Sequence, residues 1–518
     1  MKSNKKVSVL VVVLAILLLL ISGCTQIVSQ QEVEDKEALT VGMAFEPGNL
    51  DPAEGWNGWF SVQSGMGQTL FRLTEEMVLK PWLAKSWNQI DQLTWKIELH
   101  EGIKFHNGEL VDAMAVKNSL ERTLEVNNRA EGLLRIDSIE VKSDSQLLIS
   151  TTEPNPALAN YLADPMTVVV NAAEAERVGE DFAQRPVLTG PYQLRDYKKD
   201  VQIVVERNND YWGPTAQLEG ITFKFISDEM GRVMAFQAGE IDIAQNVPTS
   251  SIANLEQQDG LNVLSDSSLR THLLYLNLKR APFSDLNVRR AINKVVDREA
   301  LAESVMEGGA IAGVGPFPLV LPFGGEELEG YDYDLEEASR LLEEAGWELN
   351  SDGIREKDGQ ELELELYTYD ARPELPIIAE VVQAQLKEVG VDVAIRVVEN
   401  ITNVLQDGSY DLAMYSMNTA PTADPGYFLE LVFQAETSSN FNNFGSYKAD
   451  QLISQLSSTF ELEKRNRLAR QVQEIILAEA AHLFLVYPTI NMGVSDQVTG
   501  YQVHPSEFYL VNENLNLE

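Results

Sequence analysis

Five histidines are the side chains best suited to acid–base catalysis or metal binding, because imidazole titrates near neutral pH and ligates transition metals. They are His100, His106, His272, His482 and His504. None has the close spacing that puts two metal ligands on one helix or strand. His100 and His106 flank a turn around Gly102, a pattern that exposed histidines at strand ends share. The histidines therefore predict no metal centre.

Paired carboxylates are the second possible source of chemistry, since two neighbouring acids can divide acid and base roles. The pairs are Glu75–Glu76, Glu336–Glu337 and Glu343–Glu344, and each fits a solvated helix face. Residues 325–337 (GEELEGYDYDLEE) could attract a cation, but they also fit the acidic start of a helix. The sequence lacks G-x-S-x-G, phosphate-loop, H-E-x-x-H and dinucleotide glycine motifs. We expect a protein that is not an enzyme and needs no cofactor; a secreted hydrolase is the alternative.

The N-terminus reads as a targeting segment. Three lysines precede an apolar run, Val7 to Ile21, that is shorter than the roughly 20 residues of a spanning helix. Ile21-Ser22-Gly23-Cys24 resembles a bacterial lipobox, in which the leader is cut before a lipidated cysteine. We expect residues 1–23 to be a lipoprotein signal peptide, Cys24 to carry the lipid and residues 24–37 to form a tether. An uncleaved anchor is the alternative, and both place the body outside the cytoplasm.

This localisation is extracytoplasmic, at the outer face of the cell membrane, or in the periplasmic space if an outer membrane exists. Composition fits a body of two or three domains: 518 residues, 44 % hydrophobic and 23 % charged. The net charge of −39 repels phosphate backbones and argues against nucleic-acid binding. The single cysteine excludes an internal disulfide and a Cys-rich zinc site.

Strand and helix patterns alternate along the body, which predicts a mixed α/β fold. Runs rich in β-formers cover residues 38–45, 93–99, 201–205, 221–225 and 391–398. Helical spacing covers residues 111–123, 289–305, 335–345 and 378–389, and the last two helices stop at Gly346 and Gly390. The elements follow no fixed repeat period, so a solenoid or propeller is not expected.

Several sequence blocks carry a family resemblance. The segment 93–122, LTWKIELHEGIKFHNGELVDAMAVKNSLER, resembles the signature region of the peptide/nickel family (family 5) of extracytoplasmic solute-binding proteins, the receptors of ABC importers. Further blocks follow in family order: PWLAKSW at 81–87, TGPYQL at 189–194, ERNNDYWG at 206–213, AFQAGEIDI at 235–243, LNLKRAPFSDLNVRRAIN at 276–293, YDLEEASRLLEEAGW at 333–347 and AEVVQAQLKEVG at 379–390.

The resemblance implies a bilobal α/β fold whose two lobes, with mixed β-sheets, close around a solute by a hinge motion. Lobe I would take residues 36–60, 188–270 and 487–518, with an inserted subdomain over 61–187, and lobe II would take residues 271–486. Tyr275–Asn277 and Leu485–Tyr487 would be the hinge strands. The implied partners are an ABC permease and its ATPase subunits, served by a monomeric receptor. A receptor fold repurposed for signalling or adhesion is the alternative.

The loop Asn418 to Pro425 decides between two branches of the family. Asp424-Pro425 matches a pair found in the peptide branch, but the acid that binds the solute ammonium is replaced near Pro421. The Trp and Tyr of the nickel branch would fall near Thr419 and Ala423, and its Arg near Asp164 to Met166; all three are missing. Arg129 resembles an arginine stretch of the nickel branch. The sequence therefore indicates a divergent branch.

We select candidate ligand-binding residues by position and chemistry. They are Trp56, Trp59, Phe60, Arg129, Arg372, Asn418, Thr419 and Thr422. The three aromatic residues follow Leu50-Asp51-Pro52 and could enclose a solute, the arginines could bind carboxylates, and the last three offer neutral hydrogen bonds. We expect a short peptide or a metal–chelator complex; a bare metal ion is disfavoured because no ligand cluster is visible.

Overall fold

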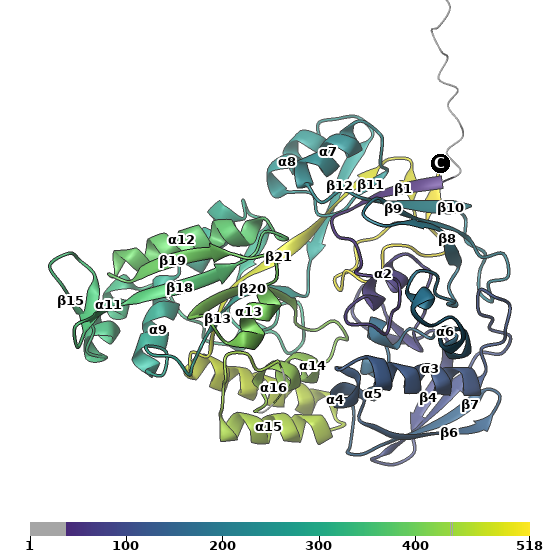
Figure 1. The fold of residues 1–518 in the computed structure, drawn as a ribbon, viewed down its shortest axis with the longest axis horizontal. Helices are drawn as coiled ribbons and strands as arrows, with labels where there is room; N and C mark the ends of the chain where they lie inside the picture. The colour runs from purple at the N-terminus through teal and green to yellow at the C-terminus, as the bar shows by residue number, and fades with distance from the viewer. Residues whose placement is uncertain (1–37, 436, 438) are drawn as a thin grey trace, which may run out of the picture.

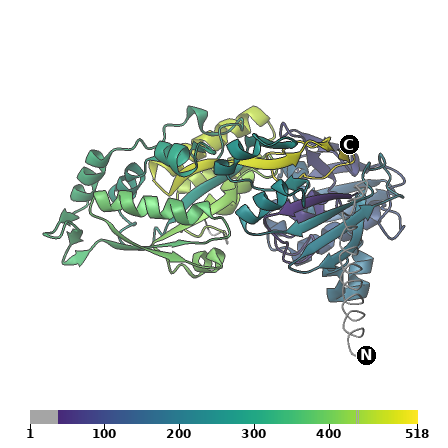
Figure 2. The ribbon, with the colours of Figure 1, turned by 90° about the horizontal axis from the view of Figure 1, so that it is seen from above.

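The computed structural model describes residues 38–435, 437 and 439–518. The signal peptide, Cys24 and the tether expected at residues 1–37 lie outside the described residues. Figures 1 and 2 show two lobes placed side by side and joined through the strand β21 (His482–Ser495). Within the described part of the chain, no helix combines the length and hydropathy needed to cross a membrane.

One sheet of 12 strands runs through both lobes (Figure 1). Its main path is β19 (Asp392–Val397), β18 (Glu363–Thr368), β20 (Leu412–Asn418), β13 (Arg270–Leu276), β21, β11 (Ile243–Ala244), β1 (Ala38–Met43), β10 (Gly220–Phe225), β9 (Gln202–Arg207) and β8 (Tyr192–Lys198). Two further strands, β12 (Leu261–Ser267) and β14 (Ala310–Ala312), pair with β21.

The long strand β21 changes partners along its length. Its first part pairs with β13 of the second lobe, from His482 opposite Tyr275 to Val486 opposite His272. Its last part, Thr489 to Ser495, pairs with β12 of the first lobe. The chain therefore passes between the lobes near residues 268–270 and 487–489. The residue-level division into lobes stays a prediction.

The first lobe carries a second, antiparallel sheet in the order β4-β5-β7-β6. Its strands are β4 (Ala84–Gln89), β5 (Thr94–Leu99), β7 (Gln146–Thr151) and β6 (Ile136–Ser143). The helix α3 (Ala113–Val126) packs on this sheet, and Asp112 caps it by accepting a hydrogen bond from the Ala115 amide at 2.8 Å. This sheet and the helices on it form a buried cluster of their own, called here the subdomain.

The remaining elements of the first lobe are short. They are α2 (Gly58–Gln63), β2 (Phe71–Leu73), β3 (Leu79–Pro81), α4 (Ala130–Leu134), α5 (Leu158–Tyr161), η1 (Pro165–Thr167), α6 (Ala172–Val178), η2 (Gly179–Ala183), α7 (Glu229–Gln237), α8 (Thr249–Leu255), β22 (Val498–Thr499) and β23 (Asn516–Leu517).

The second lobe packs most of its helices around its part of the large sheet in one core. Its helices are α9 (Leu286–Val295), α10 (Arg298–Ala300), η3 (Leu301–Val305), η4 (Gly325–Glu327), α11 (Leu335–Glu344), α12 (Glu374–Glu388), α13 (Ile401–Asp407), α14 (Gly426–Phe428), η5 (Leu429–Phe433), α15 (Tyr447–Ser458) and α16 (Leu462–Ala478). A small ribbon comprises β15 (Glu348–Leu349), β16 (Arg355–Lys357) and β17 (Gln360–Glu361).

The single helix predicted over residues 289–305 is wrong. The helix α9 ends at Val295 because Val296 takes an extended conformation, with φ −87° and ψ 114°. Asp297 then starts a new turn by accepting a hydrogen bond from the Ala300 amide at 2.9 Å. A five-residue π-helical turn, Leu301–Val305, follows.

Candidate functional site

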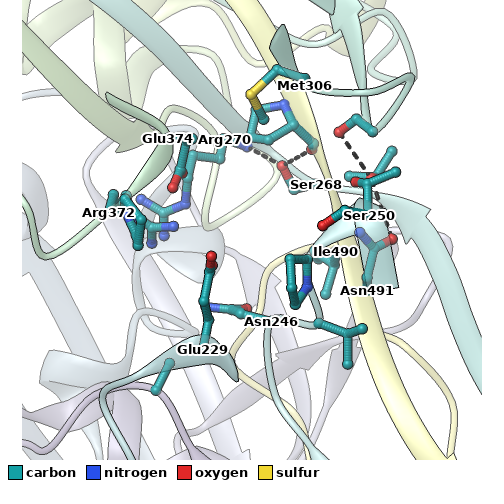
Figure 3. A pocket seen from close by; sticks show the side chains of 18 of the residues that line it. Glu229, Asn246, Ser250, Ser268, Arg270, Met306, Arg372, Glu374, Ile490 and Asn491 are labelled. Carbon is teal, nitrogen blue, oxygen red and sulfur yellow. Dashed lines mark hydrogen bonds between the residues drawn. The ribbon is translucent and has the colours of Figure 1, made fainter. Parts of the chain in front are cut away.

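Two adjoining cavities lie between the lobes. The first, of about 400 Å³, is walled by Phe45, Trp56, Trp59, Tyr369, Tyr415 and Phe508; it is called here the aromatic chamber. The second, of about 250 Å³, is lined by Glu229, Asn246, Ser250, Glu374 and Asn491, among others; it is called here the polar chamber (Figure 3). Phe45, Arg270, Ala371, Arg372 and Glu507 line both. The two cavities therefore form one continuous cleft.

The chamber walls come from loops at the ends of strands of the large sheet. Phe45 follows β1, Tyr369 and Arg372 follow β18, and Asn418 ends β20. β18 runs parallel to β20, so their carboxyl ends reach the same edge of the sheet. Ligands of α/β proteins bind outside the carboxyl ends of strands, where side chains from neighbouring loops converge. The sheet thus positions the groups that face a solute.

Arg372 is a cation of this cleft that lacks a hydrogen-bond or ion-pair partner among the described residues. Among the described residues, none makes a hydrogen bond or ion pair with its guanidinium, which lies 5.3 Å from the centre of the Phe45 ring. Arg270 is instead paired with Glu507 (Nε to Oε1, 3.0 Å). Burial and the charge of Arg270 lower the pKa of Arg372, and the opposing attraction of Glu507 and Glu374 offsets this only in part. An anionic group would relieve this imbalance.

Glu507 and Glu374 set the charge around Arg372. Burial alone would raise the pKa of Glu507, but Arg270 and Arg372 hold it below its usual value. Burial also opposes ionisation of Glu374, but a hydrogen bond from His272 (Nε2 to Oε1, 3.0 Å), with the nearby Arg372, lowers the pKa of Glu374 to about 2. Both acids are therefore ionised at neutral pH.

Arg129 closes one side of the aromatic chamber. Its guanidinium lies 3.6 Å from the centre of the Trp56 ring, which fits a cation–π contact. It donates a hydrogen bond to the Tyr427 hydroxyl at 2.8 Å and pairs with Asp164 at 3.5 Å. Trp56 is 56 % exposed and so has free surface for a solute. Arg129 is already occupied, which makes it a wall of the chamber rather than a free anion site.

The structure brings together five of the eight sequence candidates. Trp56, Trp59, Arg129, Arg372 and Asn418 line the aromatic chamber.

The other three candidates do not line either chamber. Phe60 is 1 % exposed and packs against Phe223, with ring centres 5.3 Å apart, because the helical turn of α2 directs it into the lobe. Thr419 is buried and donates to the Leu269 carbonyl at 3.4 Å. Thr422 is also buried. These three side chains are buried within the protein, so they do not face either chamber.

Several residues that line the chambers were not predicted from the sequence. Glu507 and Phe508 come from the C-terminal segment. Tyr369 follows β18, Tyr415 lies within β20, and Arg270 begins β13. No motif or spacing in the sequence identifies these residues as neighbours, because they come together only in the folded structure. Asp424, which the family pattern did mark, is held away from the cleft by two 2.6 Å hydrogen bonds from Arg465.

The histidines serve the fold in the described residues. His272 is fully buried beside Glu374, and His100 stacks on Trp212 with ring centres 5.1 Å apart. Burial lowers the pKa of His106 to about 4 and that of His482 to about 3, so both are neutral at pH 7. Over residues 38–435, 437 and 439–518, no three His, Cys, Asp or Glu side chains gather as a metal site would require.

Two lobes that share a sheet and enclose a cleft are the architecture of solute-binding receptors. The family described as bacterial extracellular solute-binding proteins, family 5 (middle) matches residues 78–440. The chain belongs to this family, which confirms the resemblance, the bilobal α/β fold and the receptor function expected from the sequence.

Named relatives bind different solutes. The nickel-binding protein NikA of Staphylococcus aureus is 29 % identical over 458 residues, covering 88 % of this chain and 90 % of NikA. The oligopeptide-binding protein AppA of Bacillus subtilis is 26 % identical over 530 residues, covering 98 % and 97 %. The crystal structure of S. aureus NikA in complex with Ni(L-His)2 superimposes with a TM-score of 0.83 at 28 % identity, covering 93 % of this chain and 100 % of that one.

Proposed function

We propose that this receptor captures a carboxylate-bearing organic solute between its lobes, and that Arg372 binds the carboxylate. The observation that carries the proposal is the guanidinium of Arg372, which lines both chambers and has no hydrogen-bond or ion-pair partner among the described residues. A guanidinium binds a carboxylate strongly because it can donate two parallel, charge-assisted hydrogen bonds to it. Trp56, Trp59 and the other aromatic walls enclose the rest of the solute, and Asn418 offers an amide.

The acidic side chains of the aromatic chamber indicate whether a solute with an ammonium group could bind there. Asp164 is paired with Arg129 and Glu507 with Arg270, while Glu46 accepts a hydrogen bond from Tyr197 at 3.0 Å. Each lining acid of this chamber is therefore occupied, which disfavours a free ammonium group there. A metal–chelator complex needs no such acid, because its amines are bound to the metal.

A short peptide is the second candidate, and one residue favours it. Glu229 lines the polar chamber and points toward Arg372 and Glu374 across it (Figure 3). It makes no hydrogen bond or ion pair with another described residue. A peptide with its carboxylate at Arg372 would place its ammonium group in this chamber. The names of the two relatives, nickel-binding and oligopeptide-binding, include both solute types.

We further propose how the receptor is attached and used. Residues 1–23 are removed, Cys24 is lipidated, and residues 24–37 tether a monomer to the outer face of the cell membrane. The loaded form passes its solute to an ABC permease driven by ATPase subunits. The lobes divide at the boundaries expected from the sequence, with lobe I at 36–60, 188–270 and 487–518, the insertion at 61–187 and lobe II at 271–486. The short apolar run and the lone cysteine support the anchor.

Native mass spectrometry of residues 25–518, purified from the native host, tests the proposed solute. The mass of the native protein is compared with that of the denatured chain. We expect either a set of peptide masses or a single adduct with a metal isotope pattern. A bound solute without a carboxylate would contradict the role of Arg372.

A further inference from the structure

The lobes meet a second time, at a place separate from the strand β21. In Figure 1, α4 and α5 of the subdomain lie against α14 and α16 of the second lobe. The contact joins Arg129, Arg135, Asn160 and Tyr161 to Thr422, Asp424, Tyr427 and Glu430; it is called here the rim contact. Arg129 takes part in this contact and also lines the aromatic chamber, so the contact borders the chamber.

Tyr427 belongs to the second lobe in sequence but to the subdomain in packing. Its side chain is fully buried in the same apolar cluster as Trp95, Leu133 and Tyr161. Its hydroxyl accepts the hydrogen bond from Arg129, and burial raises its pKa well above the usual value. Separating the lobes would pull this ring out of the subdomain core, which costs the apolar burial and the hydrogen bond.

Polar groups of the rim contact are also buried in the closed arrangement. Arg135 donates a charge-assisted hydrogen bond to Glu430, whose side chain is 7 % exposed. Asn160 donates a hydrogen bond to the Thr422 carbonyl at 2.8 Å. Each bond crosses from one lobe to the other, so all of them must break together on opening.

The rim contact is connected to the chamber through two routes. Arg129 lines the chamber and also holds Tyr427. Pro421 lines the chamber one residue before Thr422, whose carbonyl takes part in the contact. A solute that touches Arg129 or Pro421 therefore acts on groups that hold the rim closed.

We propose that the rim contact is a latch that holds the lobes closed, with Tyr427 and Glu430 as its main holding groups. Neither residue lines the cleft, so the latch acts through the closed population rather than through solute contact. The coupling to solute rests on the function proposed above; the latch itself does not.

Single-molecule energy transfer on the solute-free protein tests the latch. Every described element starts at Ala38 or later, so a chain from Thr25 keeps the described fold and lacks the only native cysteine. Ser143→Cys on β6 and Lys448→Cys on α15 replace exposed residues on the two sides of the rim. Tyr427→Phe and, separately, Glu430→Gln should shorten the closed-state dwell time by about tenfold each.

Tyr410→Phe is the matched control. Tyr410 is fully buried in the second lobe, and its hydroxyl donates to the Phe441 carbonyl of the same lobe at 2.9 Å. This variant loses a buried tyrosine hydroxyl but leaves the rim contact unchanged, so its closed-state dwell time should equal that of the wild type. Thermal unfolding confirms that all variants are folded.

The proposal is overturned if Tyr427→Phe and Glu430→Gln dwell in the closed state as long as the wild type. A wild type that stays open without solute, or a constant transfer efficiency in all variants, also overturns it. No solute enters this measurement, so its result is independent of whether Arg372 binds a carboxylate.

Discussion

Replacing Arg372 should weaken solute binding without weakening the fold. A hydrogen bond to a charged group contributes about 1.5–3 kcal/mol, so Arg372→Ala should raise the dissociation constant roughly 10- to 150-fold. The described residues give Arg372 no ion pair to lose; Arg270 repels its charge, while Glu507 and Glu374 attract it. Because these effects oppose each other, the thermal midpoint should stay close to the wild-type value.

Isothermal titration calorimetry measures this effect with two probes, the nickel–histidine complex and tetra-alanine. Arg396→Ala is the control, since Arg396 lies on β19, its side chain is 58 % exposed, and its ion-pair partner among the described residues is Glu365. The control should bind each probe as tightly as the wild type does. Equal affinity of Arg372→Ala and wild type for a probe that the wild type binds would refute the assignment of Arg372 as the carboxylate site.

Three further outcomes follow from the contacts of single side chains. Trp56→Ala removes a chamber wall and the cation–π partner of Arg129, so the calorimetric dissociation constant should rise roughly three- to tenfold; no change would remove Trp56 from the site. Asp424→Asn leaves the buried Arg465 charge uncompensated, so urea unfolding should show a loss of about 3–5 kcal/mol, and a loss below 1 kcal/mol would contradict this reading. The pKa of His482 is about 3 in the folded chain and near 6.5 in the unfolded chain. As the pH is lowered, protons therefore bind the unfolded chain at a higher pH than the folded chain, and the free energy of unfolding decreases. Between about pH 8 and pH 5 this group costs about 2 kcal/mol, and His482→Phe should abolish that share of the acid loss in urea titrations.

Several elements could be located from local sequence patterns, because apolar periodicity and a glycine after the last turn mark the extent of a helix. The helix α11 ends at Glu344 and α12 at Glu388, close to the expected stops. Gly346 and Gly390 both have positive φ, +85° and +82°, which glycine adopts without strain. The prediction of one helix over residues 289–305 was wrong because Val296 is extended. The sequence around Val296 does not distinguish an extended valine from a helical one.

Site residues could be predicted only where the family pattern or the residue type marked them. Arg372 and Trp56, which line the aromatic chamber, could be selected because a cation and an aromatic residue stand near expected pocket loops. The ion pair of Arg270 and Glu507 joins residues 237 positions apart, so no local pattern contains it. Phe60 and Thr419 lie in the right segments, but one turn of backbone directs them into the core, and residue order alone does not give that direction.

A crystal structure of the protein with its co-purified solute tests the central claim most directly. We expect the solute in the aromatic chamber, with a carboxylate on the Arg372 guanidinium and Trp56 against its body. Electron density for the solute outside the cleft between the lobes, or a solute in the cleft that leaves Arg372 untouched, would contradict the account.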